Sequence, residues 1–462
     1  MESSVSDKNR FARVAGIVLA AGKGTRMQSD TPKVLQTLLD VPMLWYVLSE
    51  LSRVCQTIYP VLGYMHEQVE AAFPQYKDYF VHQAEQKGTG HAVDCALPLV
   101  KKGDFSHVLV VNGDTPLVTA EILTEFVDKG LSSGAPVSVL SMEPESAKPY
   151  GRIVRFANGS VDRIVEARDI EDPQVQDIKE VNSGIYLLRV DVATTLLSSL
   201  DADNRQNEYY LTQVVELARK ANYSVQAFNF GNLPALLGIN TVSELCLQED
   251  LLRSRIVHGH LKKGVVVRNP VSVSIGPFVD IEPGAEICGP ARIVGKTCIK
   301  KKSRIEANTV IEDCSIRGAT IRSFSHLSGA VIEEDCQVGP FARLRPGTFM
   351  SSSARVGNFV EIKKSVIGRG SKVNHLSYVG DSELGEEVNI GAGTITCNYD
   401  GQNKHKTEIR DKAFVGSNTA LVAPVTLGAG SLVGAGSTIT RDVPADSLAV
   451  ARAKQKNLER KK

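Results

Sequence analysis

The sequence has no excess of charge and no long hydrophobic run. Its 53 Lys and Arg residues balance 52 Asp and Glu residues and leave a formal net charge of +1. No bulk field therefore favours nucleic acid or a membrane surface as a partner. The apolar stretch 14–22 is too short to span a bilayer, and because it leads directly into Lys23 it is also a poor signal sequence. We expect a cytoplasmic protein that binds neither nucleic acid nor membranes.

The cysteines lack any paired spacing. Eight of them are scattered between Cys55 and Cys397, and no C-x-x-C pair occurs. This distribution predicts reduced thiols of the cytosol and argues against a disulfide framework or a zinc site. With 462 residues, 42% hydrophobic and 23% charged, the chain can form two or three domains with proper cores.

The first half, roughly 10–230, alternates short β-branched runs with amphipathic stretches. We predict a helix over 43–53, and strands over the runs 14–20, 107–111, 137–142 and 183–188. Strands that alternate with helices indicate an α/β domain with a doubly wound, mostly parallel, Rossmann-like sheet.

The second half carries an aliphatic residue at every sixth position. The longest runs are Ile275, Ile281, Ile287, Ile293, Ile299, Ile305 and Ile311, then Ile332, Val338, Leu344, Met350, Val356 and Ile362, and then Val415, Leu421, Leu427, Val433 and Ile439. Six steps of 100° turn a helical face away by about 120°, so an amphipathic helix is excluded. Hexapeptide repeats predict a left-handed parallel β-helix of about ten coils. The register slips near 316–326 and at 366–367 and stops between Cys397 and Ile409, and we expect extruded loops at these breaks.

A further helix is outlined between the halves by Val242, Leu245, Leu252 and Ile256. It fits a rigid connector or an ordinary packing helix equally well. The predicted division is a first domain over 1–238, a linker helix over 239–260 and a β-helix domain over 261–462 that ends in a basic tail. We expect that tail to be solvated and mobile, with contact to phosphate as the alternative.

Two features of the first half indicate a phosphate site. A glycine-rich turn with Gly22 and Gly24 follows the first strand, and the cations Arg26 and Lys33 lie just beyond it. Glycines at a strand end let backbone N–H groups approach phosphate oxygens, but the spacing fits neither a dinucleotide fingerprint nor a Walker-type P-loop. Asp114 closes the strand 107–111 and suits a Mg²⁺ ion shared with phosphates, with an Asx-turn as the alternative.

The second half concentrates bulky polar side chains in a few coils. A structural β-helix needs only aliphatic, small and turn residues, yet the stretch 341–399 contains Arg345, Lys363, His375, Tyr378, Asn389, Asn398 and Tyr399. This clustering indicates a site.

Longer motifs resemble a known family. The first half contains LAAGKGTRM (19–27), QAEQKGTGHA (83–92), YGRI (150–153), VEA (165–167), NSG (182–184) and EYYLT (208–212), and the second half contains GPFARLRPG (339–347), GNFVEIKK (357–364) and NIGAGTITCNYDG (389–401). The former set resembles the sugar-phosphate nucleotidyltransferases. From about residue 13 to residue 453, the chain resembles the bifunctional N-acetylglucosamine-1-phosphate uridyltransferase / glucosamine-1-phosphate acetyltransferase family.

For the first half, the resemblance implies uridylyl transfer from UTP, giving pyrophosphate and UDP-N-acetylglucosamine, a precursor for peptidoglycan and lipopolysaccharide. Catalysis is then in-line positioning and charge neutralisation without a general base, because the sugar phosphate is already ionised. Asn112 and Thr115 stand where Tyr and Val are expected, and Ser183 replaces the more usual Thr. The implied roles are base and ribose binding by Leu19, Ala20, Ala21, Gly22, Gln83, Gly88 and Thr89, phosphate contact by Arg26 and Lys33, Mg²⁺ binding by Asp114 and Asn240, amino-sugar binding by Gly151, Glu166 and Asn182, and further substrate contacts by Asn112 and Gly113.

For the second half, the resemblance implies acetyl transfer from acetyl-CoA to glucosamine-1-phosphate. His375 is the implied general base, because an attacking amine must lose a proton near neutral pH, and we expect Glu361 to orient its ring and His405 to face solvent. The implied sugar-phosphate ligands are Arg345, Lys363, Tyr378 and Asn389, and the implied acetyl-CoA ligands are Ala392, Asn398, Tyr399, Ser417, Ala435 and Arg452.

The β-helix also implies a homotrimer with a site shared between subunits. Outward-facing Phe341, Phe349, Phe359 and Tyr378 would otherwise stay exposed. Two alternatives remain at this point: a monofunctional sugar-1-phosphate nucleotidyltransferase with a structural or regulatory β-helix, and an assembly subunit without turnover.

Overall fold

A computed structural model describes residues 11–27 and 29–460, so the last two residues of the basic tail lie outside the described part. The chain forms two compact units that divide between Glu249 and Asp250. The division point lies within helix α8 (Val242–Lys262). This helix contains the four residues that outlined a helix between the halves of the sequence. The domain limits 1–238, 239–260 and 261–462 remain a prediction.

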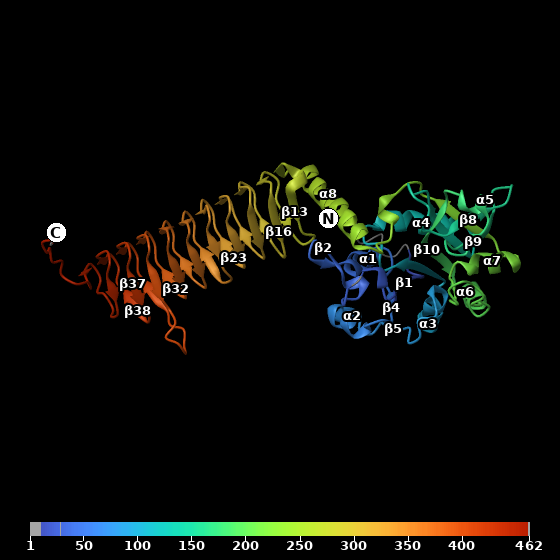
Figure 1. Cartoon of the computed structure of the whole chain (residues 1–462), viewed down its shortest axis with the longest axis horizontal. Coiled ribbons are helices and arrows are strands. Elements are labelled where there is room, and N and C mark those ends of the chain that lie inside the picture. Colours follow the sequence, from blue (N-terminus) through green and yellow to red (C-terminus); the bar gives the residue numbers. More distant parts are fainter. Residues whose placement is uncertain (1–10, 28, 461–462) are drawn as a thin grey trace. The chain divides into compact units, whose positions relative to one another are not determined.

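The first unit is built on a mixed sheet with the strand order β11-β7-β10-β6-β1-β4-β5, to which the pair β8 and β9 is attached (Figure 1). Strand β1 pairs in parallel with β4 and β6, whereas β10 runs antiparallel to β6 and β7. The strands are β1 (Val14–Ala20), β4 (Ile58–Leu62), β5 (Val81–His82), β6 (His107–Asn112), β7 (Val137–Met142), β8 (Arg152–Arg155), β9 (Val161–Val165), β10 (Val181–Arg189) and β11 (Val225–Asn229), with a separate hairpin of β2 (Thr37–Leu38) and β3 (Val41–Pro42).

Helices cover both faces of this sheet, which confirms the doubly wound prediction. Along β6, Leu109 and Val111 join one hydrophobic cluster while Val108 and Val110 join another. Alternate side chains of a strand point to opposite faces, so both faces are buried. The helices are α1 (Met43–Leu51), α2 (His66–Ala72), α3 (Thr89–Lys102), α4 (Ala120–Ser133), α5 (Pro173–Gln176), α6 (Val190–Leu197) and α7 (Gln213–Lys220).

The predicted elements of the first half are confirmed with small shifts at their ends. The runs 14–20 and 137–142 are strands β1 and β7, and 107–111 extends by one residue in β6. The run 183–188 lies within β10, and the helix predicted over 43–53 ends at Leu51.

In the described part of the second unit, three parallel sheets wind around one hydrophobic interior, and each strand pairs with a strand one coil away (Figure 1). The first sheet contains β12 (Val266–Arg268), β15 (Glu286–Cys288), β18 (Arg304–Ile305), β21 (Thr320–Ile321), β24 (Gln337–Val338), β27 (Arg355–Asn358), β30 (Lys372–His375), β33 (Asn389–Ile390), β36 (Phe414–Val415), β39 (Leu432–Val433) and β41 (Leu448–Ala449). The second contains β13 (Val273–Ile275), β16 (Ala291–Val294), β19 (Thr309–Glu312), β22 (His326–Ser328), β25 (Arg343–Leu344), β28 (Glu361–Lys363), β31 (Tyr378–Gly380), β34 (Ile395–Cys397), β37 (Ala420–Val422) and β40 (Thr438–Ile439). The third contains β14 (Asp280–Ile281), β17 (Cys298–Ile299), β20 (Ser315–Ile316), β23 (Ala330–Ile332), β26 (Thr348–Met350), β29 (Val366–Ile367), β32 (Ser382–Leu384), β35 (Thr407–Ile409) and β38 (Val425–Leu427).

The six-residue aliphatic repeat fills the interior of this left-handed β-helix. Every aliphatic residue of the three predicted runs is buried, from Ile275 through Ile439. Successive sides of the coil each contribute one such residue, so the period follows from the triangular cross-section.

The breaks in the repeat have two structural causes. Ile311, Ile316 and Ile321 are all buried at steps of five, so two successive sides of the coil are each shortened by a residue and no loop is extruded there. Ile362 and Ile367 show the same shortening, and the expectation of loops at these two breaks is therefore wrong. The third break is a loop: the chain leaves the coil after β34, forms a bridge between Tyr399 and Lys404, and returns at β35 (Figure 1).

Among the described residues, no helix combines the length and the apolar character that crossing a bilayer requires.

Candidate functional site

The glycine-rich turn of the first unit follows β1, whose buried run ends at Ala20. Gly24 has φ +60°, and a Cβ there would lie 2.5 Å from the Cβ of Lys33. A side chain at this position would be strained and would collide with Lys33. Glycine therefore lets the turn fold tightly against the segment that carries Lys33.

Four polar side chains from distant parts of the chain meet beside this turn. The ammonium of Lys33 lies 2.5 Å from Oδ2 of Asp114 and 2.9 Å from Oδ1 of Asn240. The guanidinium of Arg26 donates to the same Asn240 oxygen at 3.3 Å. The structure thus brings together the predicted phosphate contacts and the predicted metal ligands.

The backbone holds Asp114 and Asn240 at this point. The amide of Ile239 donates to the carbonyl of Asp114 at 2.9 Å, and the amide of Asn240 donates to the Glu244 carboxylate at 2.6 Å. Asp114 follows β6 and Asn240 precedes α8, so a strand end and a helix start fix the pair.

The oxygens of Asp114 and Asn240 converge on one cation, the Lys33 ammonium. A carboxylate and an amide carbonyl are hard oxygen ligands of the kind that Mg²⁺ prefers. The donor set therefore fits a magnesium ion, and the ammonium marks where positive charge is held.

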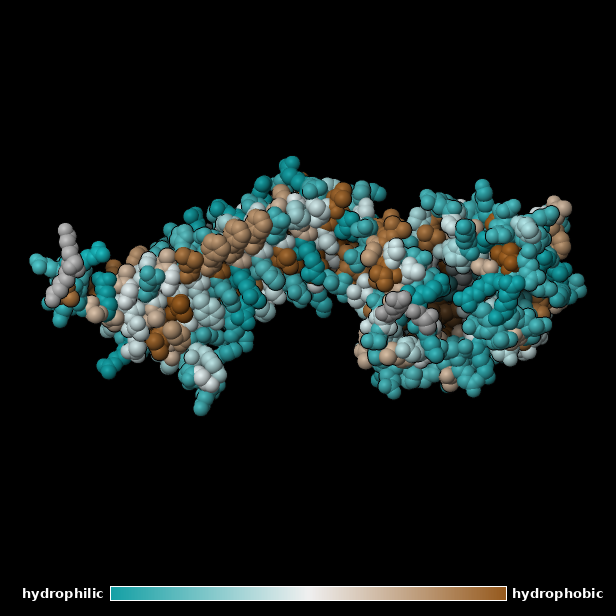
Figure 2. Space-filling model, in the orientation of Figure 1, coloured by the Kyte–Doolittle hydropathy of each residue, from teal (hydrophilic) through white to brown (hydrophobic). Residues whose placement is uncertain are grey.

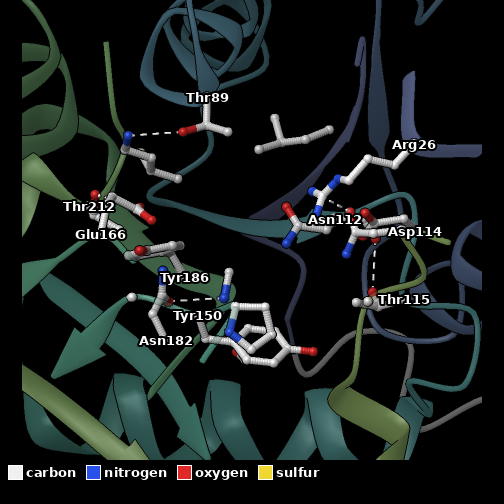
Figure 3. Close-up of a pocket in the computed structure, with 18 residues that line it drawn as sticks. Arg26, Thr89, Asn112, Asp114, Thr115, Tyr150, Glu166, Asn182, Tyr186 and Thr212 are labelled. Atoms are coloured by element: carbon white, nitrogen blue, oxygen red, sulfur yellow. Dashed lines mark hydrogen bonds between the residues drawn. The ribbon is translucent and has the colours of Figure 1, made fainter. Parts of the chain in front are cut away.

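Two cavities meet at this cluster. One of about 430 Å³ and one of about 230 Å³ share the lining residues Leu19, Thr89, Asn112 and Asp114. The larger is lined further by Ala20, Ala21, Gly22, Lys33, Gln83 and Gly88, and the smaller by Arg26, Gly151, Glu166, Asn182 and Asn240 (Figure 3). The predicted base-binding set and the predicted sugar-binding set thus line separate but adjoining cavities.

Short contacts position the wall of the larger cavity. The side-chain amide of Gln83 is buried and donates to the carbonyl of Gly88 at 2.9 Å. Gly88 has φ +113°, and a Cβ there would lie 2.6 Å from the carbonyl oxygen of Tyr209. Gly113 donates its amide to Leu19 at 2.9 Å but is not among the lining residues.

The smaller cavity contains a partly buried carboxylate, that of Glu166. Thr212 donates its hydroxyl to Glu166 at 3.0 Å, and burial raises the pKa of Glu166 above its ordinary value. Burial also raises the pKa of Tyr150 to about 12. Figure 3 shows Glu166, Asn182 and Tyr150 turned toward the same space. Such an arrangement suits the hydroxyl and amide groups of a sugar.

Sequence reasoning missed several lining residues of this cavity, among them Tyr150, Tyr186 and Thr212. Tyr150 and Thr212 lie within the motifs YGRI and EYYLT, so the motifs themselves contained a signal. Tyr186 lies in the apolar run of β10, where nothing in the sequence separates a cavity residue from a core residue.

In the second unit, the partner of His375 differs from the prediction. Nδ1 of His375 lies 3.1 Å from Oδ1 of Asn358, the residue directly beside it on the neighbouring coil. Glu361 lies in another sheet and accepts a hydrogen bond from Arg345 at 2.9 Å. The expectation that Glu361 orients the ring is therefore wrong, because strand pairing places Asn358, and not Glu361, next to His375.

Neighbouring coils of the second sheet carry three of the four predicted sugar-phosphate ligands: Lys363 and Tyr378 lie in its strands, and Arg345 directly follows β25. Tyr378 pairs with Glu361, the partner of Arg345, while Asn389 belongs to the first sheet. Lys363 lies 3.6 Å from Asp381, a residue that sequence reasoning missed.

The loop between β34 and β35 adds polar groups to this region. Asn398 is buried and donates to Asp381, and the nearby Lys363 lowers the pKa of Lys404. Two ammonium groups this close favour an anion between them. Tyr399 is exposed, and His405 is only partly exposed and lies 2.7 Å from the Asp400 carboxylate, so the expectation that it simply faces solvent is corrected.

Most of the predicted acetyl-CoA ligands form a column along one corner of the β-helix. The amide of Asn418 donates to Ala392 at 2.7 Å and that of Gly436 donates to Ser417 at 2.8 Å, so the corners of successive coils stack. Arg452 donates to the carbonyl of Ala435 at 2.7 Å and extends the column by one coil.

The fold and these sites define a two-unit transferase with a nucleotide-type site on the sheet and a second site on the β-helix. Residues 16–173 match the MobA-like NTP transferase domain. The bifunctional protein GlmU of Oleidesulfovibrio alaskensis is 47% identical over 447 residues, which cover 96% of this chain and 97% of that protein. The bifunctional protein GlmU of Lawsonia intracellularis is 42% identical, over 99% of this chain and 100% of that protein. The one of Thermotoga maritima is also 42% identical, over 95% of this chain and 96% of that protein.

The chain belongs to the family of the bifunctional protein GlmU. It is an enzyme with a nucleotidyltransferase and an acyltransferase activity, as the sequence predicts. The β-helix is accordingly more than a structural extension, and the two alternatives, a monofunctional nucleotidyltransferase and an inactive assembly subunit, are set aside.

Proposed function

We propose that the second unit acetylates glucosamine-1-phosphate with acetyl-CoA, and that the first unit transfers uridylyl from UTP to the resulting N-acetylglucosamine-1-phosphate. The observation that carries the uridylyl step is the pair of adjoining cavities, with Lys33, Asp114 and Asn240 where they meet. A nucleotide in the larger cavity and a sugar phosphate in the smaller one would bring their reacting phosphorus and oxygen atoms together at that point.

In this proposal, the sugar phosphate attacks the α-phosphorus of UTP and pyrophosphate leaves. No side chain needs to remove a proton, because the attacking phosphate oxygen is already ionised. Mg²⁺ held by Asp114 and Asn240 would supply charge neutralisation at the phosphates. Lys33 and Arg26 both contact Oδ1 of Asn240, so these two cations lie beside the proposed Mg²⁺ site. They would stabilise the charge that develops on the leaving pyrophosphate.

The walls of the two cavities select the reactants. The backbone of Leu19, Ala20, Ala21 and Gly22, with Gln83, Gly88 and Thr89, would bind the uracil and ribose. Gly151, Glu166 and Asn182 would bind the acetylated amino sugar, with Asn112, which lines both cavities, beside the phosphates. A buried polar group left without its partner is costly, which discriminates against sugars that lack the matching group.

For acetyl transfer, we infer that His375 acts as the general base. The side-chain oxygen of Asn358 faces Nδ1 and would accept a hydrogen bond from Nδ1–H, which leaves the lone pair of Nε2 free to take a proton. The amine of the sugar attacks the thioester carbonyl, His375 removes the amine proton, and the thiol of coenzyme A leaves with a proton. The products are an amide and free coenzyme A.

The remaining residues of the second unit would bind its two substrates. Arg345 and Lys363, with Lys404 nearby, would hold the sugar phosphate, and Tyr378 and Asn389 would contact the ring. Acetyl-CoA would be bound by the corner residues Ala392, Ser417, Ala435 and Arg452, together with Asn398 and Tyr399 of the loop.

We further propose a homotrimer that acts in the cytoplasm. Phe324, Phe341 and Phe359 are exposed and stack along one edge of the β-helix, with ring centroids 4.9 and 5.3 Å apart. Figure 2 shows an apolar row of this kind along the β-helix. Covering it in a three-fold ring would bury the rings and bring a neighbour's loop or tail to each site. The eight cysteines are all free, in keeping with a reducing compartment.

One pair of assays tests the proposal. Purified protein should release free thiol from acetyl-CoA only with glucosamine-1-phosphate, and it should release pyrophosphate from UTP and Mg²⁺ only with N-acetylglucosamine-1-phosphate. Pyrophosphate release that required a different sugar phosphate would refute the assignment of the smaller cavity.

A further inference from the structure

A cluster of two histidines and a glutamate lies outside both cavities of the first unit. His66 and Glu70 belong to α2, and His82 ends β5, the neighbouring edge strand of the sheet (Figure 1). Nδ1 of His66 lies 3.0 Å, and Nε2 of His82 2.7 Å, from the same oxygen of Glu70. The two imidazole rings are 4.7 Å apart. Neither proposed reaction uses these three side chains.

The spacing of this cluster is compatible with a metal ion. Positions i and i+4 of a helix face the same side, so His66 and Glu70 project together. The three ligand atoms lie within 4.8 Å of one another, and within the described residues no other group of His, Cys, Asp or Glu meets this spacing. Ligands at the usual Zn–N and Zn–O distances stand about 3.3 Å apart around a tetrahedral ion. Small rotamer adjustments would bring the three atoms to that spacing.

The chemistry of the ligands limits which metal ion the cluster would bind. Imidazole nitrogens suit zinc and its transition-metal neighbours, whereas Mg²⁺ prefers oxygen. Two histidines and a glutamate leave a fourth position for water, and all three side chains are partly exposed, so an ion can reach them from solvent.

We propose that His66, Glu70 and His82 form a zinc-binding site, separate from the magnesium site of the uridylyl reaction. The ion would replace the shared hydrogen bonds and clamp α2 to the end of β5. The next residue is Gln83, whose buried side chain forms part of the wall of the larger cavity. Zinc would therefore fix a strand end that supports the nucleotide site without touching the reactants.

The test is calorimetric titration of the full chain with zinc chloride, after chelator treatment and in a buffer without magnesium. An Asp114→Asn, Cys246→Ser background removes the proposed magnesium ligand and an exposed thiol, both of which could also take zinc. In this background we expect one zinc ion per chain. His66→Gln, Glu70→Gln and His82→Gln should each weaken its binding about 100-fold or more, because each removes one of three ligands. His326→Gln, which changes an exposed histidine of the β-helix, is the matched control and should leave the isotherm unchanged.

A second measurement separates ligand loss from misfolding. Zinc should raise the unfolding temperature of the first unit in wild type and in His326→Gln, but not in the three ligand variants. With Asp114 intact, those variants should still release pyrophosphate with Mg²⁺, because they lie outside both cavities. Zinc binding of equal affinity in the background protein and its His82→Gln variant would overturn the proposal, and so would a background protein that binds zinc only in the millimolar range.

Discussion

The two units assemble their sites in different ways. In the first unit, Arg26 and Lys33 follow β1, Asp114 follows β6 and Asn240 precedes α8, and their side chains meet at one place. In the second, site residues recur at the coil length, so His375 pairs with Asn358, 17 positions earlier in the chain. A doubly wound sheet gathers distant residues at one edge, whereas a solenoid brings together residues one coil apart.

The sharpest way to test this comparison is to disable one site and measure the other. Asp114→Ala should abolish pyrophosphate release, because it removes the carboxylate that holds Lys33 and is proposed to hold Mg²⁺. Acetyl transfer should stay at the wild-type rate, since the two sites lie in separate compact units. Pyrophosphate and thiol release, followed on the same preparation, measure both. Normal uridylylation would remove Asp114 from the proposed metal site.

The mirror change is His375→Ala. Loss of a general base should lower acetyl transfer by about 10²–10⁴-fold and leave uridylylation intact. His326→Gln, in the neighbouring sheet, should affect neither activity. Equal loss of both activities would indicate misfolding, and unchanged acetylation would make His375 a structural residue.

The packing of the β-helix can be tested with Ile305→Ala. Ile305 is fully buried in the interior of the coil, so the cavity left behind should lower the free energy of unfolding of the second unit by about 2–5 kcal/mol. Val271→Ala, at an exposed position, should cost far less. The unfolding of the second unit is measured by titrating each variant with denaturant and assaying its acetyl transfer. In Ile305→Ala, uridylylation should persist at denaturant concentrations that already abolish acetyl transfer. A cost below about 1 kcal/mol would contradict a close-packed interior.

The smallest expected effect concerns the orientation of His375. Asn358→Ala should lower kcat for acetyl transfer about tenfold and leave KM for acetyl-CoA nearly unchanged, because Asn358 positions the base and does not bind the substrate. Gln337→Ala, on the same sheet, is the control. A change in KM alone would indicate that Asn358 contacts substrate.

Much of the fold followed from local patterns. The alternation of strands and helices predicted the sheet, and the aliphatic period predicted the interior of the β-helix residue by residue, because each side of a coil packs one side chain inward. The shortened sides at Ile316 and Ile367 were misread as loops, since a missing residue and an extruded loop both interrupt a period. Residue patterns indicated Arg26, Lys33, Asp114 and the polar cluster within 341–399, the resemblance supplied the other site residues, and all their roles remain predictions.

The sequence by itself determined the architecture of this protein, its membership of a bifunctional family and the candidate residues of both sites, because these depend on periodicity and on motifs. Only the tertiary structure decided which residues meet. In the folded chain, Asn358 is the hydrogen-bond partner of His375, and Glu361 is that of Arg345. His66 and His82 both contact Glu70 at the edge of the sheet. These pairings depend on strand register and on the packing of a helix against a strand, which join residues that no local pattern connects.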